Sequence, residues 1–138
     1  MYRNPHTDWS GWAITKDGQL LVVVENGFIA LPGGRNLENN TALKSAIQKL
    51  INETGYKVVD PEKVDLIYEG KPDPSKDRTC FLHTTPFENL EPVVPEGKSL
   101  DVITSKLIEK KKWEEEMVWQ KVRRADVPLY ELVKDKIW

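Results

Sequence analysis

The chain has 138 residues, a formal charge of −2, 39% hydrophobic and 30% charged residues, and a single cysteine, Cys80. This length accommodates one domain, while the near-balanced charge and lone cysteine exclude a generally basic nucleic-acid binder, a disulfide framework and a cysteine-built zinc site. No apolar run reaches the roughly 18 residues that span a bilayer, and the first six residues lack the apolar stretch of a signal peptide, so we expect one cytoplasmic domain over residues 1–138 that enters no membrane.

The first part of the chain predicts strands joined by tight turns. Apolar runs typical of strands lie at 12–15, 20–24 and 28–31. Asp17-Gly18 and Asn26-Gly27 separate these runs, and such dipeptides form hairpin turns because glycine tolerates a positive φ. The middle run is continuously apolar, which is typical of a strand covered on both faces.

A helix is predicted at about 41–54. Its apolar residues are spaced as one helical stripe and are Leu43, Ala46, Ile47, Leu50 and Ile51. Asn40 or Thr41 can cap the N-terminus through a side-chain oxygen, and Gly55 stands where a left-handed residue ends a helix. These three signals agree on the same segment.

The rest of the chain predicts further strands and two more helices. Strands are expected at 56–59, 64–68, 79–84 and 117–122, with a loop at 71–77 and an irregular segment at 88–97. Leu100, Ile103, Leu107 and Ile108 indicate a helix that runs into residues 110–116. A short terminal helix begins at Asp126. Strands interrupted by one helix and closed by another indicate an α/β sandwich.

The segment from Gly33-Gly34 to Gly55-Tyr56 resembles the Nudix box, G-x5-E-x7-R-E-U-x-E-E-x-G-U, in which U is a bulky apolar residue. With Gly34 first, Gly55 and Tyr56 fill its last two positions without a gap. The resemblance implies a Nudix-type α/β/α sandwich with a mixed central sheet, the box helix at about 41–54 and a C-terminal helix. It also implies hydrolysis of a nucleoside diphosphate linked to another group, assisted by Mg²⁺ or Mn²⁺.

The acidic positions of the box carry other residues in this chain. Asn40 replaces the first glutamate, Gln48 the arginine, Lys49 the adjacent glutamate and Asn52 the first of the closing pair, so that only Glu53 is retained. In the signature three glutamates share one helix face, which here is formally neutral. We therefore interpret the box as degenerate and leave its catalytic residues unassigned.

Metal ligands and phosphate ligands are expected near the box. Glu53 is a candidate metal ligand, the alternative being a solvated residue paired with Lys49. Further metal candidates are Glu38, Glu114, Glu115 and Glu116, although charge runs are usually solvated faces. Phosphate-binding candidates are Gly33, Gly34, Lys49 and Arg78, because glycine permits close backbone approach and a lysine supplies a point charge.

Other conspicuous side chains have simpler interpretations. A base could stack on an aromatic ring, although aromatic residues on strands are mostly core; the candidates are Trp9, Trp12, Tyr68 and Phe81. Arg123-Arg124 is interpreted as a surface pair and Cys80 as a buried thiol.

Three functions are compatible with these residues. The favoured hypothesis is a degraded box that binds a nucleotide or pyrophosphate-containing ligand, or serves as an interaction module, with little or no hydrolysis. The second is an active metal-dependent pyrophosphohydrolase that uses Glu53, Glu38 and the run 114–116. The third is a structural or protein-binding role with a vestigial cleft. The expected partner is a nucleotide-like small molecule rather than a nucleic acid, and homodimerisation is compatible with the sequence.

Overall fold

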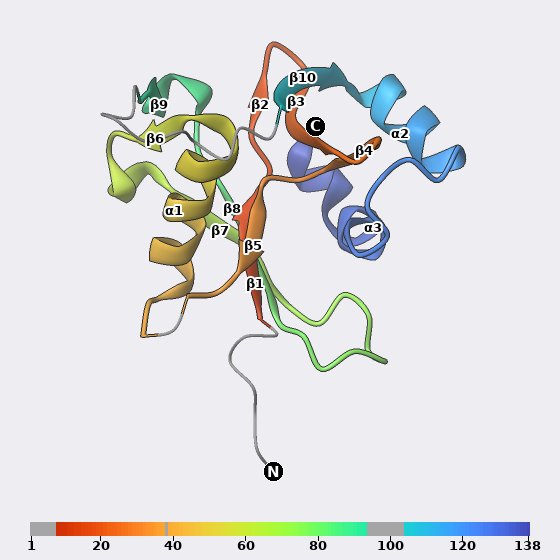
Figure 1. Ribbon diagram of the computed structural model, residues 1–138, viewed down its shortest axis with the longest axis horizontal. Coiled ribbons are helices and arrows are strands. Elements are labelled where there is room, and N and C mark those ends of the chain that lie inside the picture. The colour runs from red at the N-terminus through yellow and green to blue at the C-terminus, as the bar shows by residue number, and fades with distance from the viewer. Residues whose placement is uncertain (1–7, 38, 94–103) are drawn as a thin grey trace.

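The computed structural model describes residues 8–37, 39–93 and 104–138 (Figure 1). The strands are β1 (Trp9–Trp12), β2 (Thr15–Lys16), β3 (Gln19–Glu25), β4 (Phe28–Ala30), β5 (Gly33–Arg35), β6 (Tyr56–Val58), β7 (Asp65–Gly70), β8 (Cys80–Thr84), β9 (Leu90–Pro92) and β10 (Thr104–Glu109). The helices are α1 (Ala42–Thr54), α2 (Lys110–Val118) and α3 (Asp126–Ile137), with 3-10 turns at Pro61–Lys63 and Phe87–Asn89. Within the described ranges no helix is long and apolar enough to cross a bilayer.

The central sheet is mixed, as predicted. Its order is β5-β1-β8-β7, in which β1 and β8 run parallel and the other neighbours run antiparallel. A second sheet has the order β10-β3-β2, with β4 also paired to β3. Residues 90–92 were predicted to be irregular but form β9, which pairs with β6, so that prediction was wrong for them. The run predicted as one strand at 12–15 is divided between β1 and β2.

Helices cover both faces of the central sheet, which confirms the α/β/α sandwich (Figure 1). Successive strand residues point to opposite faces, so Trp9 and Trp12 of β1 enter different cores. Trp9 belongs to the core that includes Trp113 of α2 and Leu129 of α3. Trp12 lies on the α1 side, where its Nε1 donates to the carbonyl of Ala46 at 2.8 Å.

Helix α1 occupies the predicted segment. The Oγ1 of Thr41 accepts a hydrogen bond from the backbone N–H of Lys44 at 3.1 Å, so Thr41 is the N-cap. Gly55 has a φ of 75° and its N–H donates to the carbonyl of Ile51, which closes the last turn. Leu50 is fully buried on the inward face. The capping residues and the apolar stripe therefore predicted this helix correctly.

Residues 104–109 form a strand, so the helix predicted through Leu107 and Ile108 is wrong at this point. β10 pairs antiparallel with β3 along its length. Apolar spacing over so few residues fits either structure, whereas the buried backbone groups along β3 need hydrogen-bond partners from another strand. Leu100 and Ile103, on which the predicted helix also depended, lie outside the described residues.

Residues 117–122 do not form the predicted strand. Helix α2 extends to Val118, and the chain then turns through Gln120, whose φ is 57°. Val122 makes an isolated parallel bridge with Ile29. This bridge aligns the segment after α2 with β4, and the segment leads directly to the site described below.

Candidate functional site

Strand β5 is an edge strand of the central sheet, and its glycines accommodate bulky neighbours. A Cβ on Gly33 would lie 2.5 Å from Cζ2 of Trp9 and 2.6 Å from the carbonyl oxygen of Ser10. Gly11, which pairs with Gly33 across β1 and β5, would bring a Cβ into collision with the same indole. The two glycines therefore form a flat surface on which Trp9 packs, which explains Gly33 without a ligand.

Glu53 of α1 is hydrogen-bonded to the outer edge of β5. Its Oε1 accepts a hydrogen bond from the backbone N–H of Gly33 at 3.2 Å. Burial raises the pKa of Glu53 to about 7, although the Gly33 hydrogen bond and the charges of Lys49 and Arg123 oppose this rise. Glu53 is thus a partly buried carboxyl that keeps its proton to higher pH than a solvated glutamate does.

The other residues at the acidic positions of the box-like segment and its arginine position, Asn40, Gln48, Lys49 and Asn52, carry no carboxylate. The stem of Lys49 lies against Gly34, because a Cβ on Gly34 would be 2.9 Å from Cε of Lys49. The exposed Gln48 donates from Nε2 to Oδ1 of Asn52 at 2.9 Å. Asn40 is exposed in the turn before the helix. This face therefore presents one carboxyl, one ammonium and an amide pair.

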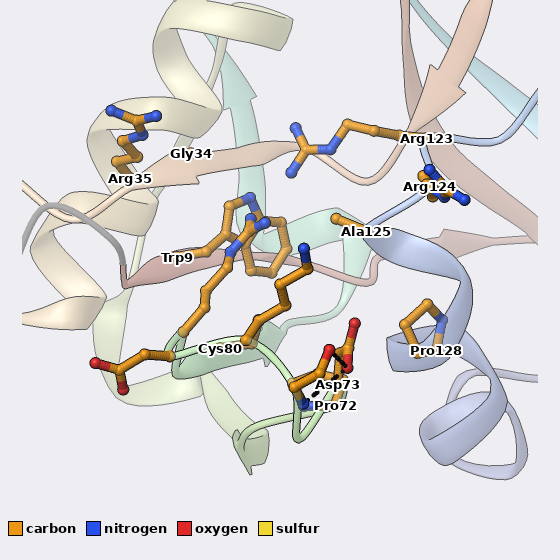
Figure 2. Close-up of a pocket in the computed structure, with 14 residues that line it drawn as sticks. Trp9, Gly34, Arg35, Pro72, Asp73, Cys80, Arg123, Arg124, Ala125 and Pro128 are labelled. Carbon is orange, nitrogen blue, oxygen red and sulfur yellow. Dashed lines mark hydrogen bonds between the residues drawn. The ribbon is translucent and has the colours of Figure 1, made fainter.

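A pocket of about 1170 Å³ opens beside Gly34. It lies between the ends of β1 and β5, the loop of residues 72–78 and the segment of residues 123–128 (Figure 2). Its cationic lining residues are Arg35, Lys76, Arg78, Arg123 and Arg124. Two acidic residues, Asp73 and Asp77, also line it. Among the described lining residues, positive charge thus predominates.

The floor of the pocket is formed by neighbouring strands of the central sheet. Trp9 and Cys80 are directly paired residues of β1 and β8, and both line the pocket. The Nε1 of Trp9 is buried and has no hydrogen-bond partner among the residues described. Burial raises the pKa of the Cys80 thiol, which keeps it protonated at neutral pH. The floor is therefore uncharged, and the positive charge is on the walls.

Two of the four predicted phosphate-binding residues line this pocket, and the other two lie next to it. Gly34 and Arg78 line it, while Gly33 and Lys49 adjoin Gly34. Their role in binding phosphate stays a prediction.

Among the residues that the structure describes, the predicted metal candidates do not form a cluster. Glu114 accepts a hydrogen bond from the hydroxyl of Tyr130 at 3.1 Å, and Glu116 pairs with Lys112 at 2.7 Å. Glu115 is exposed on α2, and Glu38 lies outside the described residues. In the described part of the chain, no three His, Cys, Asp or Glu side chains are grouped so that they could hold a metal ion.

Several pocket residues were not identified from the sequence. Arg123 and Arg124 were interpreted as a surface pair, yet both line the pocket. Arg35, the last residue of β5, was not singled out from the sequence. Of the aromatic candidates, Trp9 lines the pocket, whereas Trp12 is fully buried on the opposite face of the sheet. Only the position of two arginines shortly before a predicted helix could have drawn attention to the 123–128 segment.

Comparison with known proteins supports the fold. The sequence matches no protein-family model and no curated protein. The structure is similar to a NUDIX hydrolase from Nitrosomonas europaea, with a TM-score of 0.66, 13% identity, and coverage of 96% of this chain and 91% of that chain. An ADP compounds hydrolase gives a TM-score of 0.63 at 13% identity, covering 94% of this chain and 74% of that one. A Mutator MutT protein from Bacillus halodurans gives a TM-score of 0.58 at 15% identity, covering 88% of this chain and 77% of that one. At these identities the likeness shows a Nudix-type fold.

Proposed function

We propose that this Nudix-fold protein binds a nucleotide or another pyrophosphate-containing ligand in the pocket beside Gly34, with little or no hydrolysis. The observation that carries this proposal is the charge of the pocket. Among the described lining residues, five side chains are cationic and two are acidic. Arginine and lysine hold phosphate oxygens by charge-assisted hydrogen bonds. The volume of about 1170 Å³ slightly exceeds that of typical small-ligand pockets, which are roughly 300–1,000 Å³, so a whole nucleotide fits.

The residues of the box face support binding rather than metal-assisted hydrolysis. Mg²⁺ and Mn²⁺ are hard cations that need several oxygen ligands. Glu53 is the one carboxyl on this face. Burial raises its pKa to about 7, although the positive charges of Lys49 and Arg123 oppose this rise. Such a set does not fit a divalent cation. We accordingly interpret the box as degenerate.

In this proposal Lys49 supplies positive charge where the signature has a carboxylate. Its stem lies against Gly34, which lines the pocket, and this contact supports a role for the Lys49 ammonium at the border of the ligand space. The Lys49 ammonium then contacts a phosphate oxygen directly, as a point charge.

Binding without metal is the test. Calorimetric titration with ADP, ADP-ribose and inorganic pyrophosphate in EDTA is expected to show binding. Lys49→Ala is expected to weaken this binding by roughly tenfold, the usual loss for one hydrogen bond to a charged group. Lys44→Ala removes the same charge from an exposed position of the same helix and is the control. Binding that requires Mg²⁺, or an equal effect of both substitutions, would contradict the proposal.

One observation favours the rival function. A carboxyl with a pKa of about 7 is suited to act as a general base at neutral pH, and Glu53 is such a group. If the chain is an active pyrophosphohydrolase, nucleoside diphosphate compounds will be consumed with Mg²⁺ or Mn²⁺, and Glu53→Gln will abolish turnover. If neither turnover nor binding occurs across the panel, a structural or protein-binding role replaces both hypotheses.

A further inference from the structure

Asp126 is a buried carboxylate next to the pocket. It is the first residue of α3 and is 2% exposed. Its Oδ2 accepts a hydrogen bond from the backbone N–H of Leu31 at 2.9 Å, and its Oδ1 lies 3.6 Å from Nε of Arg123. A buried charge is costly unless it is paired. The Leu31 contact needs only an oxygen acceptor, whereas the first turn of α3 and the guanidinium of Arg123 both favour an ionised carboxylate.

Contacts restrain both the backbone and the guanidinium group of Arg123. Its backbone N–H donates to the carbonyl of Ile29 at 2.8 Å, and the N–H of Ile29 donates to the carbonyl of Lys121, also at 2.8 Å. These bonds fix the Arg123 backbone against β4. The ion pair with Asp126 then engages the Nε edge of the guanidinium. In Figure 2 the side chain extends from this segment toward Gly34, on the opposite side of the pocket.

We propose that Asp126 is a positioning residue that presents the Nη groups of Arg123 to a phosphate group in the pocket. An arginine has five N–H donors in a planar fork, so occupation of Nε leaves the outer edge to bind two phosphate oxygens. A guanidinium oriented beforehand loses less side-chain entropy when the ligand binds. This inference rests on the proposed function, because it assumes that the pocket receives a phosphate.

The charge of Asp126 also acts on a second pocket arginine. Burial raises the pKa of Asp126, while the charge of Arg123, the hydrogen bond from Leu31 and the charge of Arg78 oppose this rise, so both guanidinium groups lie in the field of this carboxyl. Arg78 and Arg123 line the same pocket and carry like charges. In its ionised form, Asp126 offsets part of the repulsion between these charges before a ligand is bound.

The test is a double-mutant cycle on ADP affinity, with Asp126→Asn, Arg123→Ala and the double variant. Asparagine has the same shape and keeps an oxygen for the Leu31 N–H, but it removes the charge. Asp126→Asn is expected to weaken ADP binding roughly tenfold in the wild-type background, a coupling of the size measured between contacting charged residues. In the Arg123→Ala background it is expected to have no further effect. Asp135→Asn removes the same charge from an exposed position of α3 and is the control.

A second readout reports on Arg123 without a ligand. The ¹H–¹⁵N signal of its Nε–H is expected to be observable in the wild-type protein and to broaden in Asp126→Asn. If Asp126→Asn does not fold, Arg123→Lys replaces it, because lysine keeps the charge and loses the fork. Arg123→Lys is then expected to weaken ADP binding, although less than Arg123→Ala does.

The outcomes separate this inference from the proposed function. If the wild-type protein binds ADP, and Asp126→Asn lowers the affinity equally with and without Arg123, the positioning role is refuted while the proposed function stands. If the wild-type protein binds neither ADP nor pyrophosphate, the proposed function fails, and the ligand-presenting role fails with it. Equal affinity of Arg123→Lys and the wild-type protein would also overturn the positioning role.

Discussion

Replacement of Glu53 by glutamine is expected to stabilise the protein at alkaline pH and to have little effect at acidic pH. The pKa of Glu53 rises from its usual 4.5 to about 7, chiefly because the carboxyl is partly buried. Between these two values the native protein retains a proton that the unfolded chain releases, so the free energy of unfolding decreases as the pH rises through this range. Glutamine carries no charge at any pH, and its Oε1 can still accept the hydrogen bond from Gly33.

The magnitude follows from the distance between the two pKa values. The interval from 4.5 to about 7 corresponds to about 3 kcal/mol at 1.36 kcal/mol per pH unit. Because Glu53 is partly exposed, solvent screening reduces this to roughly 1–2 kcal/mol. Above pH 7 the full cost of the ionised carboxyl is present, whereas below pH 4.5 the carboxyl is neutral in both states and the two proteins are nearly equal in stability.

Urea denaturation at pH 5 and pH 8, followed by circular dichroism, measures this effect. Glu53→Gln is expected to raise the free energy of unfolding by roughly 1–2 kcal/mol more at pH 8 than at pH 5. Glu69→Gln, at an exposed position of β7, is the control for the loss of one carboxylate. If Glu53→Gln gave the same change at both pH values, or destabilised the protein at pH 8, the description of Glu53 as a buried carboxyl would be refuted.

Three further substitutions test the packing around the site through the free energy of unfolding in urea. Gly33→Ala is expected to cost about 2 kcal/mol or more, because its Cβ would lie 2.5 Å from Trp9. A loss no larger than that of Gly34→Ala would contradict the packing of Trp9 on Gly11 and Gly33. Thr41→Ala removes the N-cap of α1 and should cost about 1 kcal/mol, whereas Thr41→Ser should cost less. Leu50→Ala leaves a cavity under α1 and should cost about 2–5 kcal/mol; a smaller loss would show that this core collapses around the gap.

The elements that the sequence predicted best are those specified by neighbouring residues. Helix α1 has a cap, an apolar stripe and a terminal glycine within one short segment, and all three signals are local. Asp17 and Asn26 both have positive φ values in the turns where hairpins were predicted. The segment at 104–109 was misread because its strand structure depends on pairing with β3, far away in the sequence. Short apolar runs do not distinguish a helix from a strand when the partner is unknown.

The sequence by itself determined which side chains share one face of α1. Lys49, Asn52 and Glu53 are spaced three and four residues apart, which places them on the same side of a helix. The sequence could not determine that Glu53 would be partly buried against the edge of β5, or that Arg123 would lie near it. Those facts depend on the packing of segments about 20 and 70 residues away, which only the tertiary structure decides. The same holds for the pocket, whose cationic walls come from three separate segments that share no sequence pattern. The local sequence thus determined which side chains α1 carries, whereas long-range packing decided where cationic side chains gather around a pocket.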